Sequence, residues 1–378
     1  MDGERDRRQE RVPAGELTGI ARPGSASKVN LQHIVPGTKV SLRPFKALEW
    51  KERRGELMQL ERSAYPGGVQ FDEETKMALF TGEKSIAVVA ENEEGKIIGE
   101  SCGNLLDEER DELEEGAREA DAFRFVFDRY GSRKTLYVDG FGVLPEYRGQ
   151  GIGTELTRMQ LVEAKKAGYD FAIAHVNEEK ALGIYMKFGT GVIASYPNWY
   201  GTEETHALLE LELRDMRSKL RFPEAKQKTE STCGPASISA VLSYFGKSVS
   251  EEVLAKKAKT DDRQGTSPAG MLSAATDPAY GMHARVIEHA SIDDIEGYID
   301  AGFPVIALFF LRSENDDHYS VITGYDKDNI FMMDVYAGKE QVMSKNAFAS
   351  DWFCNTFGLD RWMMVMFPKD SIKDELRK

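Results

Sequence analysis

Cysteine is scarce in this sequence: its 378 residues include only Cys102, Cys233 and Cys354. The three are spaced without a CxxC pair or a Cys/His cluster, so we predict neither a zinc site nor the disulfide framework of a small secreted domain. Residues 1–35 are charged and rich in Gly, Pro and Ser, and they lack the apolar core of a signal peptide. We therefore expect a reducing, cytoplasmic setting.

Long apolar runs and an excess of positive charge are missing as well. The longest apolar run, Val305 to Leu311, has the length of a buried strand and is too short to cross a bilayer, so we expect no membrane span. Lys and Arg number 49 against 63 Asp and Glu, which gives a formal net charge of −14. This balance argues against a nucleic-acid partner, which would need a basic surface.

The residues that carry chemistry begin with the run QKTESTCGPAS, Gln227 to Ser237, which places Cys233 where a helix is about to start. Apolar residues recur at helical spacing from Ala236 until Gly246 ends the pattern, and Pro235 falls in the first turn. A helix N-terminus favours negative charge, and a thiol attacks a carbonyl as its thiolate. Cys233 is therefore placed as a nucleophile would be.

A base and an orienting group for such a nucleophile lie further along the chain. DHYSVITGYD puts His318 at the start of an alternating apolar segment, and the strand IFMMD ends sixteen residues later at Asp334. Two antiparallel strands joined by a short hairpin would place these side chains next to each other. The carboxylate would then fix the imidazole tautomer and support its charged form. Gln227 can offer its side-chain NH2 to a developing oxyanion, beside the backbone N–H of Cys233.

Each of these residues has an ordinary structural interpretation when taken alone. A lone cysteine at the start of an apolar helix is usually a small buried hydrophobe, a strand histidine can be a hydrogen-bonded core residue, and an aspartate can close a turn. The order Gln, Cys, His, Asp in these local contexts favours catalysis instead. GTSP at Gly265 to Pro268, AGFPVIALFF and a closing FASDW complete the pattern.

In these motifs, over residues 226–367, the chain resembles the papain-like cysteine peptidases that process double-glycine leader peptides of bacteriocins. The resemblance implies a nucleophile at Cys233, a base at His318, an orienting carboxylate at Asp334 and an oxyanion donor at Gln227. Val335 stands where that family often has a proline, and no span matches the membrane transporter to which such peptidases are usually attached. A transpeptidase, as in the related phytochelatin synthases, and a non-catalytic peptide-binding module are the alternatives.

A second set of candidates lies upstream in LYVDGFGVLPEYRGQGIGTELTRMQLVEAKKAG, Leu136 to Gly168. The pattern predicts a strand, a turn at Pro145 and a helix from Ile152. Between them RGQGIG, Arg148 to Gly153, has glycines that let backbone N–H groups approach a phosphate at a helix N-terminus. The loop fails the Walker pattern because no lysine precedes Thr154, and it also fails the GxGxxG dinucleotide pattern.

What remains is RxxGxG after a strand, which resembles the pyrophosphate loop of the GNAT acyltransferases; a tight turn without a ligand is the alternative. The resemblance implies acetyl-CoA or another acyl-CoA as cofactor. It also implies Tyr185, in EEKALGIYMKFG, as the acid that protonates the departing thiolate, with an ordinary half-buried aromatic as the alternative. That family often has an asparagine three residues before Ala181, where this chain has Glu178. The residues implied to contact the cofactor are Val143, Arg148, Gly149, Gln150, Gly151, Ile152 and Gly153.

A base for the acceptor amine is expected on the central strand or the strand beside it. Asp139 is the nearest candidate, followed by Tyr137 and His175. The face on which each points depends on a β-bulge that the sequence does not declare, so all three stay open. The segment Asp107 to Asp121, with nine acidic and two basic residues, is interpreted as a solvated helix or loop, or as an acidic border that attracts basic peptides to the acceptor groove.

The predicted fold class is α/β and α+β in two enzyme domains. A flexible tail over residues 1–35 precedes a GNAT fold, a mixed sheet flanked by helices, over 36–214; a linker helix over 215–225 leads to a papain-like cysteine peptidase domain over 226–378. We expect a bifunctional enzyme in which an acyl-CoA-dependent N-acyltransferase is fused to a cysteine peptidase, both acting on peptides or proteins. An acyl-CoA sensor is the non-enzymatic alternative for the first domain.

Overall fold

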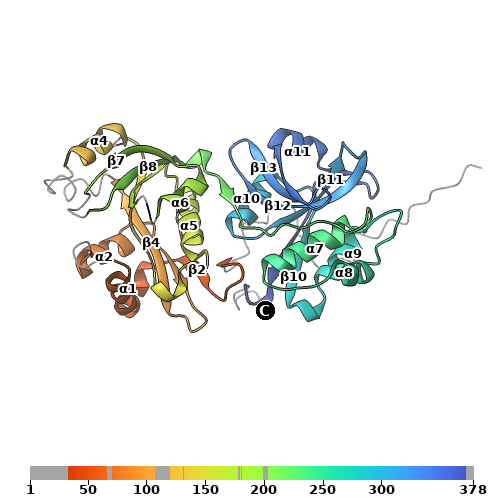
Figure 1. Ribbon diagram of the computed structural model, residues 1–378, viewed down its shortest axis with the longest axis horizontal. Helices are drawn as coiled ribbons and strands as arrows, with labels where there is room; N and C mark the ends of the chain where they lie inside the picture. The colour runs from red at the N-terminus through yellow and green to blue at the C-terminus, as the bar shows by residue number, and fades with distance from the viewer. Residues whose placement is uncertain are drawn as a thin grey trace, which may run out of the picture.

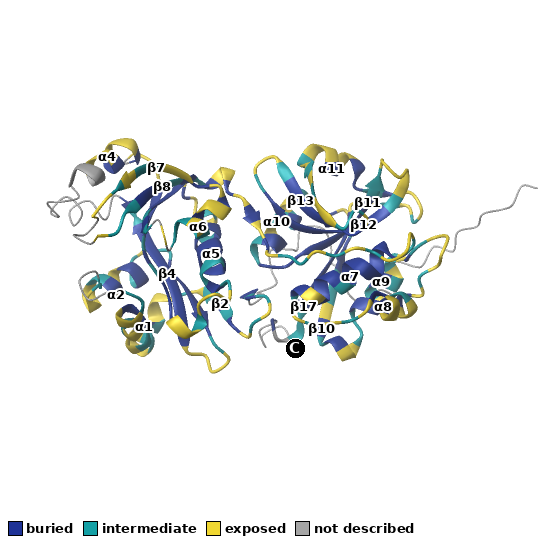
Figure 2. Cartoon of the chain, viewed as in Figure 1, coloured by how far each residue is buried: buried dark blue, intermediate teal, exposed yellow. Residues whose placement is uncertain are grey.

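The computed structural model describes residues 33–65, 70–106, 120–130, 132–177, 179, 181–198 and 203–371. Two sheets, each with its own helices, lie side by side along the long axis of the molecule, and each is built from one half of the chain (Figure 1). The strands of both sheets are largely buried, whereas the outer faces of the helices are exposed (Figure 2). The predicted two-part architecture is confirmed.

The first sheet has eight strands in the order β1-β2-β3-β4-β5-β6-β8-β7, and it is mixed because β5 and β6 run parallel. Helices α5 and α2 cover opposite faces, since adjacent residues of β4 bond to them: Ser101 to Gln160 of α5 and Glu100 to Lys76 of α2. The strands are β1 (His33–Ile34), β2 (Ser41–Pro44), β3 (Val88–Glu91), β4 (Ile97–Leu105), β5 (Thr135–Val143), β6 (Phe171–Asn177), β7 (Gly191–Tyr196) and β8 (His206–Glu212). The helices are α1 (Trp50–Ala64), α2 (Glu73–Thr81), α4 (Ala120–Tyr130), α5 (Ile152–Lys166) and α6 (Leu182–Tyr185).

The centre of this sheet opens part-way along β5 and β6. Their parallel pairing ends at Val138 and Ala174, although both strands continue beyond that point, so they splay apart. Asp139 is the extra residue of a β-bulge, because its neighbours Val138 and Gly140 pair with consecutive residues of β4. The splay and the bulge leave backbone groups of β5 without a neighbouring strand at the point where the predicted residues of the first half gather.

The second sheet has seven strands in the order β10-β17-β11-β12-β13-β14, with β9 paired to β12. Helices α7 to α9 pack on one face, and α10 and α11 pack on the other. The strands are β9 (Ser218–Lys219), β10 (Met282–Ile287), β11 (Val305–Leu311), β12 (Asp316–Tyr325), β13 (Asn329–Asp334), β14 (Lys339–Ser344) and β17 (Trp362–Pro368), and β15 (Phe353–Cys354) pairs separately with β16 (Leu359–Asp360). The helices are α7 (Cys233–Tyr244), α8 (Glu251–Ala258), α9 (Pro268–Ala275), α10 (Ile292–Asp300) and α11 (Lys345–Asp351).

The connection between the two sheets differs from the prediction. Residues 215–225 form no linker helix: Asp215 ends a 3-10 turn, β9 follows and pairs with β12, and the rest has no regular secondary structure. The physical reason is an alternation of period two, in which Met216 and Leu220 are buried while the charged residues between and after them are exposed. The segment is therefore part of the second sheet. At the other end, His33 and Val35, predicted within the tail, are buried at the start of the first sheet.

A fully buried arginine joins the two halves. Arg158 of α5 donates through Nη1 to the carbonyl oxygens of Ile299 and Asp300, at 3.1 and 2.6 Å, and through Nε to Glu155 at 2.9 Å. The Glu155 carboxylate balances the guanidinium charge, and the α10 carbonyl oxygens accept hydrogen bonds from the guanidinium. A charge removed from water requires both kinds of partner. The helix that follows the RGQGIG loop is thus bonded directly to the second half of the chain.

Residues 299–302, called the α10 turn below, receive bonds from several elements. The Nδ1 atom of His33 lies 3.0 Å from the carbonyl oxygen of Ala301, and Tyr244 at the end of α7 donates to that of Gly302 at 3.0 Å. Gly302 has φ +86, and a Cβ there would lie 1.8 Å from the His33 ring, so glycine is required. The helix that begins with Cys233 and the helix that follows the RGQGIG loop therefore both contact one turn.

Candidate functional sites

Cys233 is the first residue of α7, as predicted, and its side chain is buried but not sealed, with the residue 8% exposed. No side chain caps this helix, so the N–H groups of its first turn act on charge at the thiol. The next residue is Gly234 because α9 and the GTSP loop pack closely on the start of α7: a Cβ there would lie 2.6 Å from Met271 Sδ and 3.1 Å from Thr266 Cβ. The loop and the helix start together form one wall beside the thiol.

The predicted adjacency of His318 and Asp334 is confirmed. They lie on the antiparallel strands β12 and β13, and His318 Nε2 is 3.0 Å from Asp334 Oδ1. The same oxygen accepts from the Ser320 hydroxyl at 3.5 Å and from the backbone N–H of Tyr336 at 2.9 Å. These donors fix the carboxylate, which in turn fixes the imidazole.

The electrostatics of this pair favour an imidazolium next to the thiol. Burial lowers the pKa of His318, but bonding to Asp334 and to Cys233 outweighs it and raises this pKa to about 9. Burial raises the pKa of Asp334, but the His318 ring and backbone N–H groups outweigh it and lower this pKa. Because Nε2 is occupied by the carboxylate, Nδ1 is the nitrogen left for the thiol. A positive ring beside the sulfur of Cys233 is the environment in which nucleophilic thiols are found.

Two aromatic rings enclose the imidazole, and the sequence analysis did not identify either of them. Phe309 of β11 and Tyr336 after β13 contact the His318 ring edge to face, with centroids 5.9 and 6.2 Å away. Phe309 is buried, whereas Tyr336 is 42% exposed. Tyr336 therefore stands at the solvent side of the imidazole, where a substrate would approach. No local pattern marks it, because its contact with His318 depends on how β13 ends.

Gln227 lies beside this site, but its amide faces its own loop. Its backbone N–H donates to the carbonyl oxygen of Val335 at 2.8 Å, which ties it to the residue after Asp334. Its side-chain Nε2 donates to the carbonyl oxygens of Thr229 and Glu230, at 2.9 and 3.3 Å. The oxyanion role of Gln227 therefore stays a prediction, and it requires the amide to turn.

The RGQGIG loop has an open backbone surface at the start of α5. Gly149 and Gly151 have φ of +78 and +86, and a Cβ built on either would meet no atom within 4 Å. Gly151 is the N-cap of α5, and no side chain caps this helix. Its N-terminal N–H groups are thus available to an anion, which fits the pyrophosphate of an acyl-CoA.

Neighbouring residues fix this loop and add positive charge. Arg148 donates through Nε to the carbonyl oxygen of Val143 at 2.9 Å, which holds the loop against the end of β5. Lys187 donates to the Thr154 hydroxyl in the first turn of α5 at 3.1 Å, a cation that the sequence analysis missed. Gly153 packs on β5, because a Cβ there would lie 2.8 Å from Phe141 Cζ. Of the remaining predicted contacts, Gln150 is exposed and Ile152 is buried.

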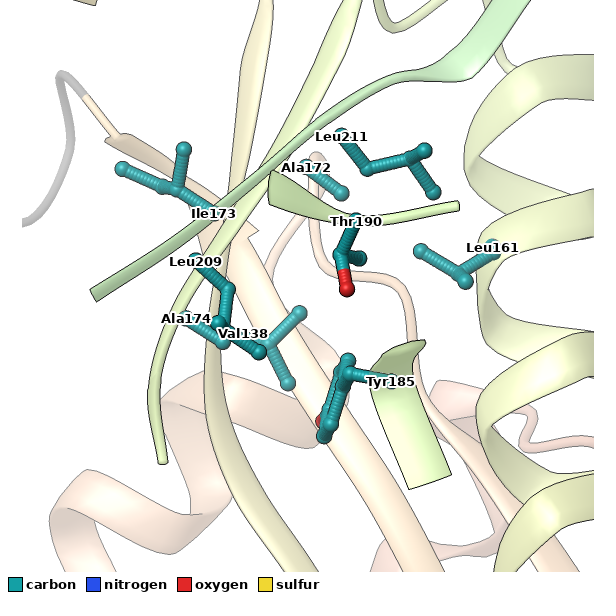
Figure 3. A pocket seen from close by; sticks show the side chains of 9 residues that line it. All are labelled: Val138, Leu161, Ala172, Ile173, Ala174, Tyr185, Thr190, Leu209 and Leu211. Atoms are coloured by element: carbon teal, nitrogen blue, oxygen red, sulfur yellow. The ribbon is translucent and has the colours of Figure 1, made fainter. Parts of the chain in front are cut away.

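Tyr185 is buried against the end of the paired part of β5 and β6. It lines a small apolar cavity with Val138, Ala174 and residues of α5 and β8 (Figure 3). Burial raises the pKa of Tyr185, and a bond with Thr157 offsets this only in part, so the phenol keeps its proton. Its helix is shorter than predicted, since α6 continues only as a 3-10 turn to the predicted stop at Gly189. Glu178 lies outside the described residues, as does most of the acidic segment 107–121.

The three candidate bases lie on or beside the splayed strands. Tyr137 Oη is 2.9 Å from His175 Nδ1, so the structure brings two of them together. Burial, with a smaller effect of His206, lowers the pKa of His175 to about 3, so its ring is neutral at physiological pH. Tyr137 packs with α4 whereas Val138 packs with α5, which puts the pair on the face opposite Tyr185. Asp139 is half-buried at the bulge, and it adds a small contribution to the raised pKa of the Cys102 thiol, which is due mainly to burial.

Comparison with known proteins assigns each half to a family. Residues 54–190 match the profile of the Acetyltransferase (GNAT) family, and residues 219–356 match that of the Peptidase_C39 like family. The chain thus joins a GNAT-like domain to a C39-like domain. Below, the two halves are called the GNAT half and the C39-like half.

Individual relatives match only one part of the chain each. An uncharacterized protein of Methanothermobacter marburgensis is 31% identical over 133 residues, 35% of this chain and 85% of the relative. N-alpha-acetyltransferase 50 of Danio rerio is 36% identical over 76 residues, 19% of this chain and 45% of the relative. Among solved structures, the peptidase domain of Streptococcus ComA, a bi-functional ABC transporter, is 24% identical, covering 38% of this chain and 98% of that chain with a TM-score of 0.32. In the described part of the chain, no helix has the length and apolar character needed to span a membrane.

Proposed function

We propose that this chain is a bifunctional enzyme, an acyl-CoA-dependent N-acyltransferase joined to a cysteine peptidase, and that both halves act on peptides or proteins. The observation that carries the peptidase is the 3.0 Å contact between His318 Nε2 and Asp334 Oδ1 beside the start of α7. The observation that carries the acyltransferase is the splay of β5 and β6 next to the open RGQGIG loop.

In the peptidase reaction the Cys233 thiolate attacks the carbonyl carbon of a peptide bond, and a C–S bond forms. The C–N bond then breaks, and His318 gives its Nδ1 proton to the departing amine. The neutral imidazole next takes a proton from water, which attacks the thioester and releases the acid and the thiolate. Asp334 stabilises the imidazolium in both steps. The resemblance of the motifs to those of peptidases that cut double-glycine leader peptides supports a leader-type peptide as substrate.

The oxyanion of this reaction needs donors near the thiol. The backbone N–H of Cys233 is one, and we assign the Gln227 amide as the other, once it turns from the carbonyl oxygens of Thr229 and Glu230. Gln227→Ala should lower kcat about 100-fold with little change in KM, which is the usual cost of losing one such donor. An unchanged kcat would remove Gln227 from the site.

For acyl transfer, the residues that would hold an acyl-CoA are Val143, Arg148, Gly149, Gln150, Gly151, Ile152 and Gly153, with Lys187 as an added cation. When bound, this group supplies an acyl thioester. Tyr185 holds its phenolic proton on the α5 face and donates it to the leaving sulfur, while a base on the opposite face accepts a proton from the amine. The likeness to an N-alpha-acetyltransferase supports an α-amino group as the acceptor.

The base is assigned to Asp139 or to the Tyr137–His175 pair, and substitution separates them. If Asp139 is the base, Asp139→Asn lowers kcat about 100-fold and His175→Gln has a small effect; if the pair is the base, the reverse holds. The acidic limb of the pH–rate profile should disappear in the variant that lacks the base. Equal, small effects in both would show that the amine loses its proton to water instead.

The whole proposal is tested by incubating the full chain with acetyl-CoA and a peptide library, followed by mass spectrometry of the products. Wild type should cleave some peptides and acetylate others. Acetylation raises the mass of a peptide by roughly 42 Da, because an acetyl group replaces one hydrogen. Cys233→Ala should lose cleavage and keep acetylation. Retained cleavage would overturn the peptidase mechanism, and products joined to an added amine would identify a transpeptidase. Acetylation that is absent from every peptide would favour an acyl-CoA sensor.

A further inference from the structure

Tyr336 stands between the His318 imidazole and solvent. Its ring contacts the imidazole edge to face, with centroids 6.2 Å apart, and the residue is 42% exposed. Its backbone N–H donates to Asp334 Oδ1 at 2.9 Å, so the carboxylate that orients the imidazole also holds Tyr336 after the end of β13. The position of this ring is therefore fixed relative to the candidate catalytic pair.

A carboxylate from the turn between β11 and β12 reaches the same phenol. Pairing of the two strands ends at Leu311 and Asp316, and the backbone N–H of Glu314 donates to the carbonyl oxygen of Leu311 at 3.1 Å. Asn315 completes this turn with φ +54, a conformation that asparagine adopts more readily than most residues. The Tyr336 hydroxyl donates to Glu314 Oε2 at 3.3 Å. A short, hydrogen-bonded turn thus presents Glu314 beside Tyr336.

The loop before the nucleophile brings a second carboxylate to the same place. The backbone N–H of Gln227 donates to the carbonyl oxygen of Val335 at 2.8 Å, and its side chain donates to that of Glu230 at 3.3 Å. Glu230 therefore lies next to the loop that carries Tyr336. The electrostatics agree with this placement, because the charge of Glu314 first, and that of Glu230 to a smaller extent, raises the pKa of the Tyr336 phenol.

Two other carboxylates near the imidazole are held by partners within the fold. Asp334 is bonded to His318, and the neighbouring Asp317 accepts from two backbone N–H groups of the β15–β16 hairpin at 3.0 and 2.7 Å. Glu314 and Glu230, by contrast, are exposed. Two exposed carboxylates beside an aromatic ring suit a cation, which the ring face attracts and the carboxylates pair with.

The proposed mechanism decides which part of a peptide meets this ring. His318 gives its Nδ1 proton to the departing amine, so that amine lies next to the imidazole. The departing amine belongs to the first residue after the cleaved bond. Because Tyr336 covers the solvent side of the imidazole, the side chain of that residue is placed against Tyr336 as it leaves the site.

We propose that Tyr336, Glu314 and Glu230 form a subsite for a positively charged side chain, arginine or lysine, on the first residue after the cleaved bond. This inference rests on the proposed peptidase function and deepens it by naming the peptides that the site prefers. Arginine suits the subsite best, because its planar guanidinium stacks on an aromatic ring while its N–H groups bond a carboxylate.

Two peptides that differ by one charge isolate this subsite. The peptide that the full chain cleaves fastest in the library test above is resynthesised with arginine or with citrulline, its uncharged analogue of similar shape, after the cleaved bond. We expect kcat/KM of wild type to be about 5-fold higher for the arginine peptide, as for an exposed ion pair with a cation–π contact. This preference should shrink in about 1 M salt, which screens exposed charges. Glu314→Gln should bring the ratio close to 1, and Glu230→Gln should lower it part of the way.

Glu73→Gln is the matched control, because it removes the same charge from an exposed carboxylate of the GNAT half, where Glu73 lies 2.8 Å from Arg54. It should leave the ratio at its wild-type value. If wild type cleaves both peptides with equal kcat/KM, or if Glu314→Gln keeps the preference for arginine, the subsite does not select a cation and the inference fails alone. If wild type cleaves no peptide of the library, the proposed peptidase fails and this inference with it.

Discussion

Arg158 of the GNAT half donates to the carbonyl oxygen of Asp300 in the C39-like half at 2.6 Å, across 142 residues of sequence. The guanidinium is fully buried and is balanced by Glu155, whose carboxylate also lies 3.0 Å from the Nε2 atom of His33. Burial raises the pKa of Glu155, but Arg158 and His33 outweigh it and lower this pKa to about 2. A charged cluster of this kind is favourable only while every member keeps its partners.

Arg158→Met should therefore destabilise the whole chain, by about 3–5 kcal/mol, because it leaves the Glu155 carboxylate buried without its cation. The carbonyl oxygens of Ile299 and Asp300 lose their Arg158 donor in the same variant, so the unfolding transitions of the two halves should separate. Urea denaturation followed by a probe in each half measures both effects.

The exposed pair Arg129–Glu210 offers the control for this experiment, since Arg129 is 47% exposed in its side chain. Arg129→Met should change stability by no more than about 1 kcal/mol. Equal, small losses for Arg129→Met and Arg158→Met would contradict a structural role for the buried cluster.

Cys233 should be the single thiol that iodoacetamide alkylates in the folded protein at neutral pH. Burial raises the pKa of Cys354 to about 12, and burial also raises the pKa of Cys102 well above its ordinary range. Cys233 instead lies beside the positive His318 ring at a helix N-terminus, and it is the most exposed of the three cysteines. Intact-mass analysis should find one adduct in wild type and in Cys354→Ala, and none in Cys233→Ala. Labelling that persists in Cys233→Ala would place the reactive thiol elsewhere.

The local features of the site could be predicted from the sequence, because they depend on short-range patterns. Helix α7 follows from apolar residues at helical spacing, and the His318–Asp334 contact follows from a hairpin between two alternating strands. The prediction of a linker helix was wrong, because exposed charges at every second position, such as Arg217 and Lys219, indicate a strand. In so short a segment, the period-two pattern of a strand is hard to distinguish from the pattern of a polar helix.

The long-range features could not be predicted from one sequence. The contact of Tyr65 with Phe141 and that of Arg158 with the α10 turn join segments that no local pattern relates. The β-bulge at Asp139 also cannot be predicted from the local sequence, because it is defined by the register between β5 and β4. Since that bulge sets which face each neighbouring side chain takes, the three base candidates could not be ranked.

The His318–Asp334 pair should make the C39-like half less stable as the pH rises from 6.5 to 9. The pKa of His318 is raised from 6.5 to about 9 in the folded protein, so the folded state binds the proton more tightly than the unfolded state. The stabilising contribution is complete below about 6.5 and is lost as the pH approaches 9. Urea denaturation of wild type and His318→Gln at several pH values should give a difference in unfolding free energy that shrinks across this range. A difference that stays constant would show that the ring is neutral in the folded state.

Tyr185→Phe should lower kcat for acyl transfer about 100-fold, because the leaving thiolate loses its proton donor. The affinity for acetyl-CoA should stay the same, since phenylalanine keeps the ring that packs on Phe141 and lines the cavity (Figure 3). Thr157→Val, which removes the bond to the phenol and the 3.1 Å bond to the Gly153 carbonyl oxygen but leaves the phenol in place, should have a smaller effect on kcat than Tyr185→Phe. Steady-state kinetics with a peptide acceptor measures kcat, and calorimetry measures the affinity. A fall in affinity with kcat preserved would assign Tyr185 to packing rather than to proton transfer.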